Sequence, residues 1–126
     1  MPLPSAFGDS PPSESLPRAR VIRQRGTFDA TRTRGRRVHN RWMTLNHLAR
    51  DPARSETGSV AFLTPKRIGS AVVRVRLRRQ MREIYRRHLA QPGESSYLIW
   101  IPRPIALELD FEGLKKCMTE LRNRLR

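Results

Sequence analysis

The segment VVRVRLRRQMREIYRRH, residues 72–88, decides how the chain is expected to fold. Its first half alternates apolar and basic residues like a strand, whereas its second half spaces apolar residues three and four positions apart. On a helix, at about 100° per residue, one side collects Val73, Leu77, Met81, Ile84 and His88, and the other collects Arg78, Arg79, Arg82 and Arg86. A strand would be unusually long and would carry charge on both faces. The segment therefore predicts one amphipathic helix.

The composition points to a polyanionic partner. The chain has 126 residues, with 26 Lys or Arg, 11 Asp or Glu and a formal net charge of +15. This length fits one domain. Such a charge concentrates polyanions, so nucleic acid is the first candidate partner and an anionic membrane surface the second. Only three of the 26 basic residues are lysines, namely Lys66, Lys115 and Lys116. Phosphate recognition by guanidinium groups and GC-rich coding both remain open as the cause of this preference for arginine over lysine.

A single cysteine, Cys117, excludes an intrachain disulfide and a Cys-based metal site, and it fits a reducing compartment. No run approaches the roughly 18 apolar residues of a membrane span, and the N-terminus lacks the apolar core of a signal peptide. We therefore expect a cytoplasmic protein that does not enter a membrane. Residues 1–19 are rich in Pro and Ser and predict a disordered tail, followed by one domain over residues 20–126.

The first half of this domain predicts one helix and two or three strands. A short helix is expected over 27–34, ended by Gly35, and a charged edge strand over 36–39. Met43 and Leu45 alternate with Trp42 and Thr44 in another strand, and VAFLTPK contains a short apolar strand closed by Pro65. The polar segment DPARSETGS between the last two strands predicts a hairpin loop.

The second half predicts a helix, a strand and a helix. Ser70 can cap the helix of the opening segment, and YLIWIP is suited to a buried strand. Asp110 can cap a last helix, whose apolar stripe is Phe111, Leu114, Met118, Leu121 and Leu125. The expected fold class is α+β, a two-layer sandwich of helices packed on a sheet, in the order α, two or three β, α, β, α.

The basic helix favours RNA phosphates as ligands. Nine Lys or Arg and one acid, Glu83, lie between residues 66 and 87. A merely solvated helix face mixes both signs and pairs them four residues apart, and here only Glu83 with Arg79 or Arg87 is expected to do so. Phe28, Trp42 and Tyr85 are candidates for stacking on bases. Core packing is an equally open role for the last two.

No pattern in the sequence predicts a catalytic or metal site of its own. Glu83 is the only acid between Gly58 and Gly93, whereas a two-metal nuclease needs several. His39, His47 and His88 lack metal-ligand spacing, and no Gly-rich phosphate loop occurs. Cys117 lies at the margin of the last helix's apolar stripe and predicts a structural role.

The run TPKRIGSAVVRVRLRRQMREIYRRH resembles the signature of the bacterial ribonuclease P protein component, and FDATRTRGRR, HNRWMTL, YLIWIPRP and the closing helix follow the same family in order. The resemblance covers roughly residues 18–126. It implies an α-β-β-β-α-β-α sandwich with a left-handed crossover. It also implies that the chain is the protein subunit of a ribonucleoprotein that removes the 5′ leader from precursor tRNA. It further implies that the catalytic RNA subunit performs the cleavage with Mg²⁺, bound mainly by that RNA, and that DNA is not a partner.

The resemblance also assigns residues to two surfaces. The basic motif facing the RNA subunit matches Lys66, Arg67, Arg74, Arg76, Arg78, Arg79 and Arg82, and Arg86 lies on the same predicted helix face. The cleft for the leader matches Phe28, with Arg32 one turn later and Arg41 and Trp42 on the strand expected to form its floor. No catalytic residue is assigned to the polypeptide.

Two residues depart from the family pattern. Val75 stands where the family has Asn between two arginines, and Arg32 stands where a second cleft aromatic often follows Phe28. From the sequence alone, Val75→Asn is expected to strengthen RNA binding or leave it unchanged. A ribosomal-protein-like structural RNA-binding protein is the alternative function, and a DNA-compacting protein is a third.

Overall fold

A computed structural model gives the fold of the chain. It describes residues 21–125 except 55, 57 and 91–95. The predicted disordered tail, residues 1–19, lies outside the described residues, as does most of the loop after the central helix. Within the described part of the chain, no helix combines the length and apolar character needed to cross a bilayer.

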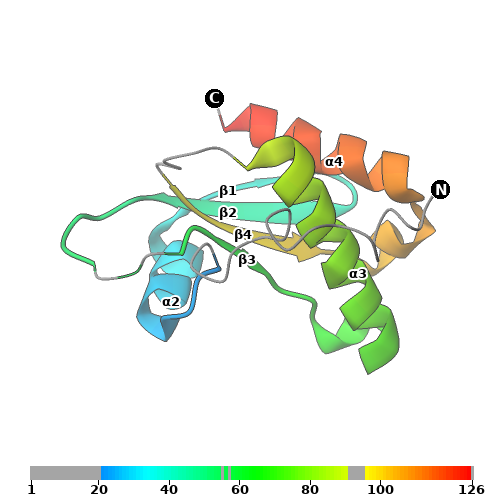
Figure 1. Cartoon of the computed structure of the whole chain (residues 1–126), viewed down its shortest axis with the longest axis horizontal. Helices are drawn as coiled ribbons and strands as arrows, with labels where there is room; N and C mark the ends of the chain where they lie inside the picture. The colour runs from blue at the N-terminus through cyan, green and yellow to red at the C-terminus, as the bar shows by residue number, and fades with distance from the viewer. Residues whose placement is uncertain (1–20, 55, 57, 91–95, 126) are drawn as a thin grey trace.

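The elements follow the predicted order (Figure 1). They are α2 (Arg25–Arg34), β1 (Arg36–His39), β2 (Met43–Ala49), β3 (Val60–Phe62), the 3₁₀ turn η3 (Lys66–Ile68), α3 (Ala71–Ile84), the π turn η4 (Tyr85–Leu89), β4 (Ser96–Pro102), the 3₁₀ turn η5 (Pro104–Glu108) and α4 (Phe111–Arg124). The predicted caps are confirmed, since the side chains of Ser70 and Asp110 accept the backbone N–H groups of Val73 and Gly113.

The four strands form one sheet in the order β1-β2-β4-β3. Strand β2 pairs antiparallel with β1 and with β4, whereas β3 pairs parallel with β4. The prediction of a hairpin between β2 and β3 was therefore wrong. The most apolar strand, β4, lies between β2 and β3. In this interior position both faces of β4 can be buried.

The side chains of β4 alternate between two separate cores. Leu98 and Trp100 join the larger cluster, which includes residues of α3 and α4. Tyr97 and Ile99 join a smaller cluster, which Phe28 of α2 packs against. All four side chains are fully buried. The sheet is therefore covered on both faces, and α2 adds a third layer to the two that were predicted, because the apolar residues of β4 point in both directions (Figure 1).

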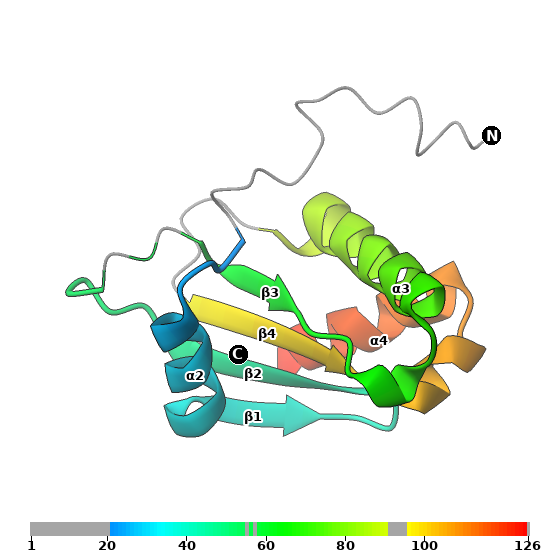
Figure 2. The same cartoon turned by 90° about the horizontal axis from the view of Figure 1, so that it is seen from below.

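The connection from β3 through α3 to β4 joins adjacent parallel strands. Figure 2 views the sheet from the α2 side, with β3 above β4, both pointing the same way, and α4 behind the sheet. Because α3 packs into the same cluster as α4, the path from β3 to β4 is left-handed. The implied left-handed crossover is thus present, and it is distinctive because about 98% of such connections are right-handed.

The apolar stripe of α3 changes direction at the π turn. Leu77, Met81 and Ile84 are buried as predicted, but His88 is exposed. Tyr85 and Leu89 are buried in its place. The N–H of Ala90 donates to the carbonyl of Tyr85 at 2.7 Å, a five-residue spacing that widens the last turn and rotates the residues that follow. The placement of His88 on the apolar stripe was therefore wrong.

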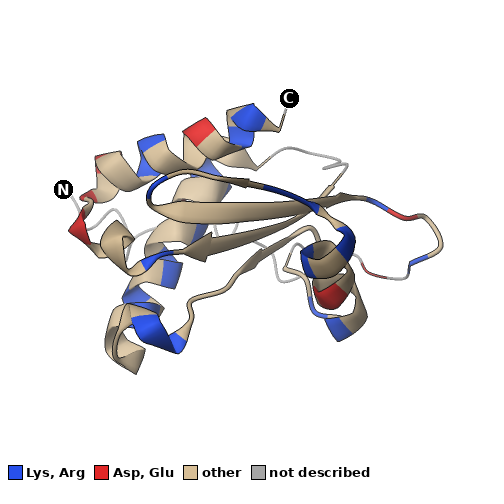
Figure 3. Ribbon diagram, turned by 180° about the vertical axis from the view of Figure 1, so that it is seen from behind, with Lys and Arg blue, Asp and Glu red and all other residues tan. Residues whose placement is uncertain are grey.

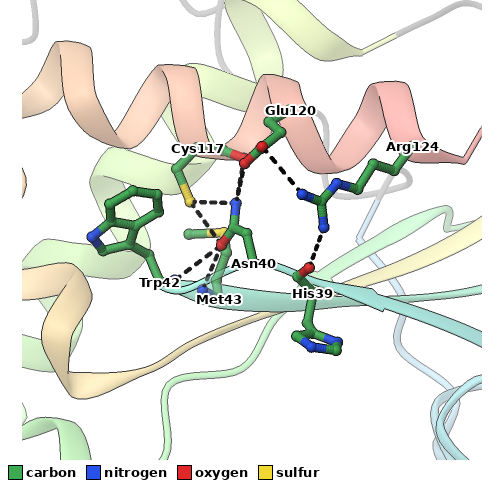
Figure 4. Close-up of polar contacts among 7 residues, drawn as sticks. All are labelled: His39, Asn40, Trp42, Met43, Cys117, Glu120 and Arg124. Atoms are coloured by element: carbon green, nitrogen blue, oxygen red, sulfur yellow. Dashed lines mark hydrogen bonds and ion pairs between the residues drawn. The ribbon is translucent and has the colours of Figure 1, made fainter.

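Asn40 fastens the turn between β1 and β2 to α4 (Figure 4). Its side-chain nitrogen donates to the Glu120 carboxylate at 2.9 Å and to the Cys117 carbonyl at 3.3 Å. Its side-chain oxygen accepts the backbone N–H groups of Trp42 and Met43, both at 3.0 Å. Since Asn40 is only 8% exposed, water has little access to replace these bonds.

We expect Asn40→Ala to lower the free energy of unfolding by about 2 kcal/mol, because the turn's backbone N–H groups lose a buried acceptor. Urea denaturation measures this change. The matched control is Asn123→Ala, since Asn123 is an exposed residue of α4, and its expected effect is below about 0.5 kcal/mol. Equal losses in the two variants would contradict the structural role of Asn40.

Candidate RNA-binding surfaces

The predicted RNA-binding residues lie on η3 and along α3, but they differ in what holds their side chains. The exposed ones are Lys66, Arg67, Arg76, Arg79 and Arg82. None of these five side chains makes a hydrogen bond or ion pair with the described part of the chain. We call them the η3–α3 cationic face. Their charges are not neutralised by the fold, so they are available to phosphates.

The remaining arginines of the predicted set are engaged within the fold. Arg74 donates to the carbonyl of Gly69 at 3.2 Å, and Arg78 donates to the hydroxyl of Thr64 at 2.8 Å. Both are only partly exposed. The charges of these two side chains add to the cationic face. Part of each guanidinium's N–H donors is occupied by Gly69 or Thr64, so fewer remain for a ligand.

Arg86 does not belong to the cationic face. Its guanidinium donates from Nε and Nη2 to the Glu83 carboxylate, and its side chain is only 12% exposed. Arg87 pairs with the same carboxylate at 2.9 Å. The expectation that Glu83 pairs with Arg79 or Arg87 is confirmed for Arg87. The pair with Arg86, three positions after Glu83, was not predicted.

A second surface lies on the α2 side of the sheet. Phe28 packs there against the smaller core, and the guanidinium carbon of Arg32 lies 5.9 Å from the centre of the Phe28 ring. Figure 2 shows α2 over one end of the sheet and η3 at the opposite end. Between them, Leu63 and Ile101 remain only partly buried. This half-covered sheet face leads from the Phe28–Arg32 pair toward the cationic face.

Two residues assigned to the leader cleft are not beside Phe28. Arg41 and Trp42 belong to the turn that precedes β2, not to the strand itself. The ring of Trp42 packs against the larger core, on the α3 and α4 side of the sheet. Its predicted place on the floor of the cleft was therefore wrong, because the alternation of β2 begins only at Met43. Arg41 is exposed at the end of the sheet.

The strand register brings other polar residues to the α2 side. Val38 packs on the larger core, so its neighbours Arg37 and His39 point to the opposite face. Arg37 is paired in register with Asn46, and its Nε donates to that side-chain oxygen at 3.3 Å. Strand alternation in the sequence predicts which face each side chain occupies, but the Arg37–Asn46 contact can be predicted only once the register of β1 and β2 is known. Figure 3 shows the basic residues that run along β1 and α2.

A buried carboxylate fixes the start of α2. Glu56, in the loop between β2 and β3, is 5% exposed. Its carboxylate accepts the backbone N–H groups of Gln24 at 2.8 Å, Gly58 at 3.0 Å and Arg23 at 3.2 Å. Arg50 donates to the backbone carbonyl of Glu56 at 3.0 Å. Sequence reasoning missed this contact, since Glu56 lies far along the chain from the helix that it holds.

Among the described residues, the pKa values of Cys117 and His88 are shifted by their surroundings. Burial raises the pKa of the Cys117 thiol, which contacts Asn40, so the thiol stays protonated at neutral pH. The pKa of exposed His88 is lowered by desolvation and by the charges of Lys115 and Arg87. Among the described residues, no group of three or more His, Cys, Asp or Glu is placed to hold a metal ion.

The left-handed crossover sheet and the arginine-rich face of its crossover helix define a small, basic α+β protein suited to a polyanionic partner. The family model described as Ribonuclease P matches residues 16–126. The chain therefore belongs to the family of bacterial ribonuclease P proteins.

Relatives and solved structures agree with this family. The ribonuclease P protein component of Symbiobacterium thermophilum is 30% identical over 109 residues, 86% of this chain and 93% of that protein. That of Desulfovibrio desulfuricans is 40% identical over 75 residues, 58% of this chain and 55% of that protein. The fold is similar to the RNase P proteins of Staphylococcus aureus (TM-score 0.71, 18% identity, 85% of this chain and 95% of that chain) and Thermotoga maritima (TM-score 0.69, 22% identity, 82% and 96%).

We expect Glu56→Gln to loosen α2 without loosening α3. The amide keeps one acceptor oxygen but places an N–H₂ group against backbone donors, a buried mismatch that costs about 1–3 kcal/mol. Hydrogen exchange should therefore quicken over residues 23–34 and stay unchanged over 71–84. Glu108→Gln is the control, because Glu108 is an exposed carboxylate of η5. Uniform acceleration across both helices would contradict a local role for Glu56.

Proposed function

We propose that this chain is the protein subunit of a ribonucleoprotein ribonuclease P, which matures the 5′ end of tRNA in the cytoplasm. In this proposal the η3–α3 cationic face binds the catalytic RNA subunit, and the α2 side of the sheet binds the 5′ leader of precursor tRNA. Family membership and the names of the relatives support the assignment of the assembly. The uncompensated charge of the cationic face supports the assignment of the surface.

The single observation that carries the proposal is this uncompensated charge. Folded proteins usually pair arginines on a helix with carboxylates three or four residues away. Here Glu83 is the only acid on α3, and it is bound to Arg86 and Arg87 instead of to the cationic face. Five neighbouring cations without carboxylates repel one another, and RNA phosphates relieve that repulsion on binding.

The α2 side of the sheet has the chemistry that a single strand requires. Unpaired nucleotides bind by stacking their bases on aromatic rings and by placing their phosphates on cations. Phe28 offers a partly exposed ring, and Arg32 holds a guanidinium beside it. Leu63 and Ile101 continue an apolar floor along the sheet. A leader lying on this face would run from α2 toward Lys66 and Arg67.

In this proposal the polypeptide positions RNA and the RNA subunit cleaves it. Mg²⁺ supplies the charge stabilisation for phosphodiester hydrolysis when bound to that RNA. The described residues of the protein do not fit a magnesium site of their own, because they offer no suitable cluster of ligands. The protein's cations neutralise phosphates of both RNAs, which lowers the repulsion between catalyst and substrate.

Reconstitution tests the proposed function. We expect the protein to raise cleavage of precursor tRNA by the cognate RNA subunit at least tenfold at low Mg²⁺, with less effect at high Mg²⁺, because its cations replace part of the ionic screening. The protein without the RNA is expected to cleave nothing. An absence of stimulation would contradict the proposal, and co-purification with bulk ribosomal RNA would favour a ribosomal-protein-like structural RNA binder instead.

The cationic face has its own test in the salt dependence of RNA binding. Each phosphate contact contributes about 0.7–0.9 to the slope of log affinity against log salt. Removing Arg76 and Arg79 together as Arg76→Gln/Arg79→Gln should reduce the slope by about 1.4–1.8. The control Lys115→Gln/Lys116→Gln removes the same charge from α4, and equal slope changes in both variants would show that only net charge matters.

A further inference from the structure

An apolar strip lies exposed within the cationic face. Val72 is 68% exposed and Val75 is 42% exposed. Among the described residues only one other large apolar side chain is exposed, Leu107 in η5. The two valines lie three positions apart on α3 and are therefore neighbours along its surface. Two exposed valines in the middle of an arginine-rich face call for a partner with an apolar surface.

The strip forms the floor of a shallow depression on α3. The depression is lined by Ala71, Val72, Val75, Arg76 and Arg79. At about 100° per residue, its centre points away from the buried side of the same helix, which holds Leu77 and Met81. It thus lies on the outermost line of α3, and the fold leaves it open.

Two arginines border this apolar floor. The side chains of Arg76 and Arg79 are exposed and have no hydrogen-bonding partner in the described part of the chain, whereas those of Arg74 and Arg78 donate to Gly69 and Thr64. The two free guanidinium groups can therefore turn toward a ligand seated on the valines. A guanidinium plane stacks on flat rings and also binds phosphate.

The charge around the depression selects its ligand. Lys66 and Arg67 lie in η3, just ahead of α3, and Arg82 is exposed one turn after Arg79. No acid occurs in the sequence between Glu56 and Glu83. An apolar protein partner would leave these charges unneutralised. An unpaired nucleobase matches both properties, because it presents a flat face to the valines and carries phosphates on either side.

We propose that this depression binds one unpaired nucleobase of the catalytic RNA, with the base against Val72 and Val75 and its flanking phosphates on Arg76 and Arg79. The inference rests on the proposed function, since that function supplies the RNA. It reverses the expectation drawn from the sequence for Val75→Asn: a polar side chain there removes part of the apolar floor and weakens binding.

The test compares affinities for the cognate catalytic RNA over a range of salt concentrations. Val72→Ser/Val75→Ser should weaken binding about tenfold at every salt concentration with an unchanged slope, because base contacts carry no counterion release. Ser and Val have similar helix propensities, so α3 should persist. Leu107→Ser is the matched control: its side chain is 45% exposed on a different element, and its affinity should stay that of the unaltered chain.

Chemical probing of the bound RNA identifies the base itself. One unpaired base should be protected by the unaltered protein and by the Leu107→Ser variant, and it should be reactive with the double valine variant. Unchanged affinity of the double valine variant, or a change in its oligomeric state, would overturn the proposal while the unaltered chain still stimulates cleavage. Failure of the unaltered chain to bind this RNA would overturn the proposed function as well.

Discussion

The burial of β4 on both faces is the constraint on which the rest of the structure depends. Tyr97, Leu98, Ile99 and Trp100 are all fully buried, so consecutive side chains need cover on opposite sides of the sheet. A strand with this requirement takes a central position, flanked by β2 and β3. One face then receives α3 and α4 and the other receives α2. The two helices that carry the proposed RNA contacts are thereby held by one strand.

Two buried polar side chains complete this arrangement. Asn40 joins the β1–β2 turn to α4, and Glu56 joins the β2–β3 loop to the start of α2. Both contacts link segments that are distant in sequence, and both satisfy backbone groups that would otherwise be unpaired in the interior. The proposed division of labour between α2 and α3 depends on this rigidity, because a surface that positions RNA needs elements that do not shift.

Local patterns in the sequence predict the elements well. The edge strand Arg36–His39, the caps Ser70 and Asp110 and the amphipathic character of α3 all follow from neighbouring residues. The predictions that were wrong concern features set by contacts between segments distant in the sequence. The hairpin between β2 and β3 was wrong because β4 displaces it, and Trp42 was assigned to the wrong face because strand alternation begins one residue later.

The candidate RNA-binding residues also show that local sequence patterns do not predict contacts between distant segments. The arginines of α3 were predicted from helical spacing and from the family resemblance. Their division into exposed, hydrogen-bonded and ion-paired groups depends on Gly69, Thr64 and Glu83 as neighbours in space. No simple sequence pattern predicts the π turn at Tyr85–Leu89. Because of this turn, His88 is exposed instead of lying on the buried side of the helix. Arg37 and Asn46 meet only through the register of β1 and β2.

The most direct test of two separate RNA surfaces is site-directed crosslinking in the complex with catalytic RNA and precursor tRNA. Since Cys117 is buried and its pKa is raised, a photoreactive group attaches selectively to an introduced cysteine. Arg79→Cys is predicted to crosslink to the catalytic RNA, and Arg32→Cys to the 5′ leader. Crosslinks from both positions to the same RNA, or from neither position to any RNA, would contradict the account.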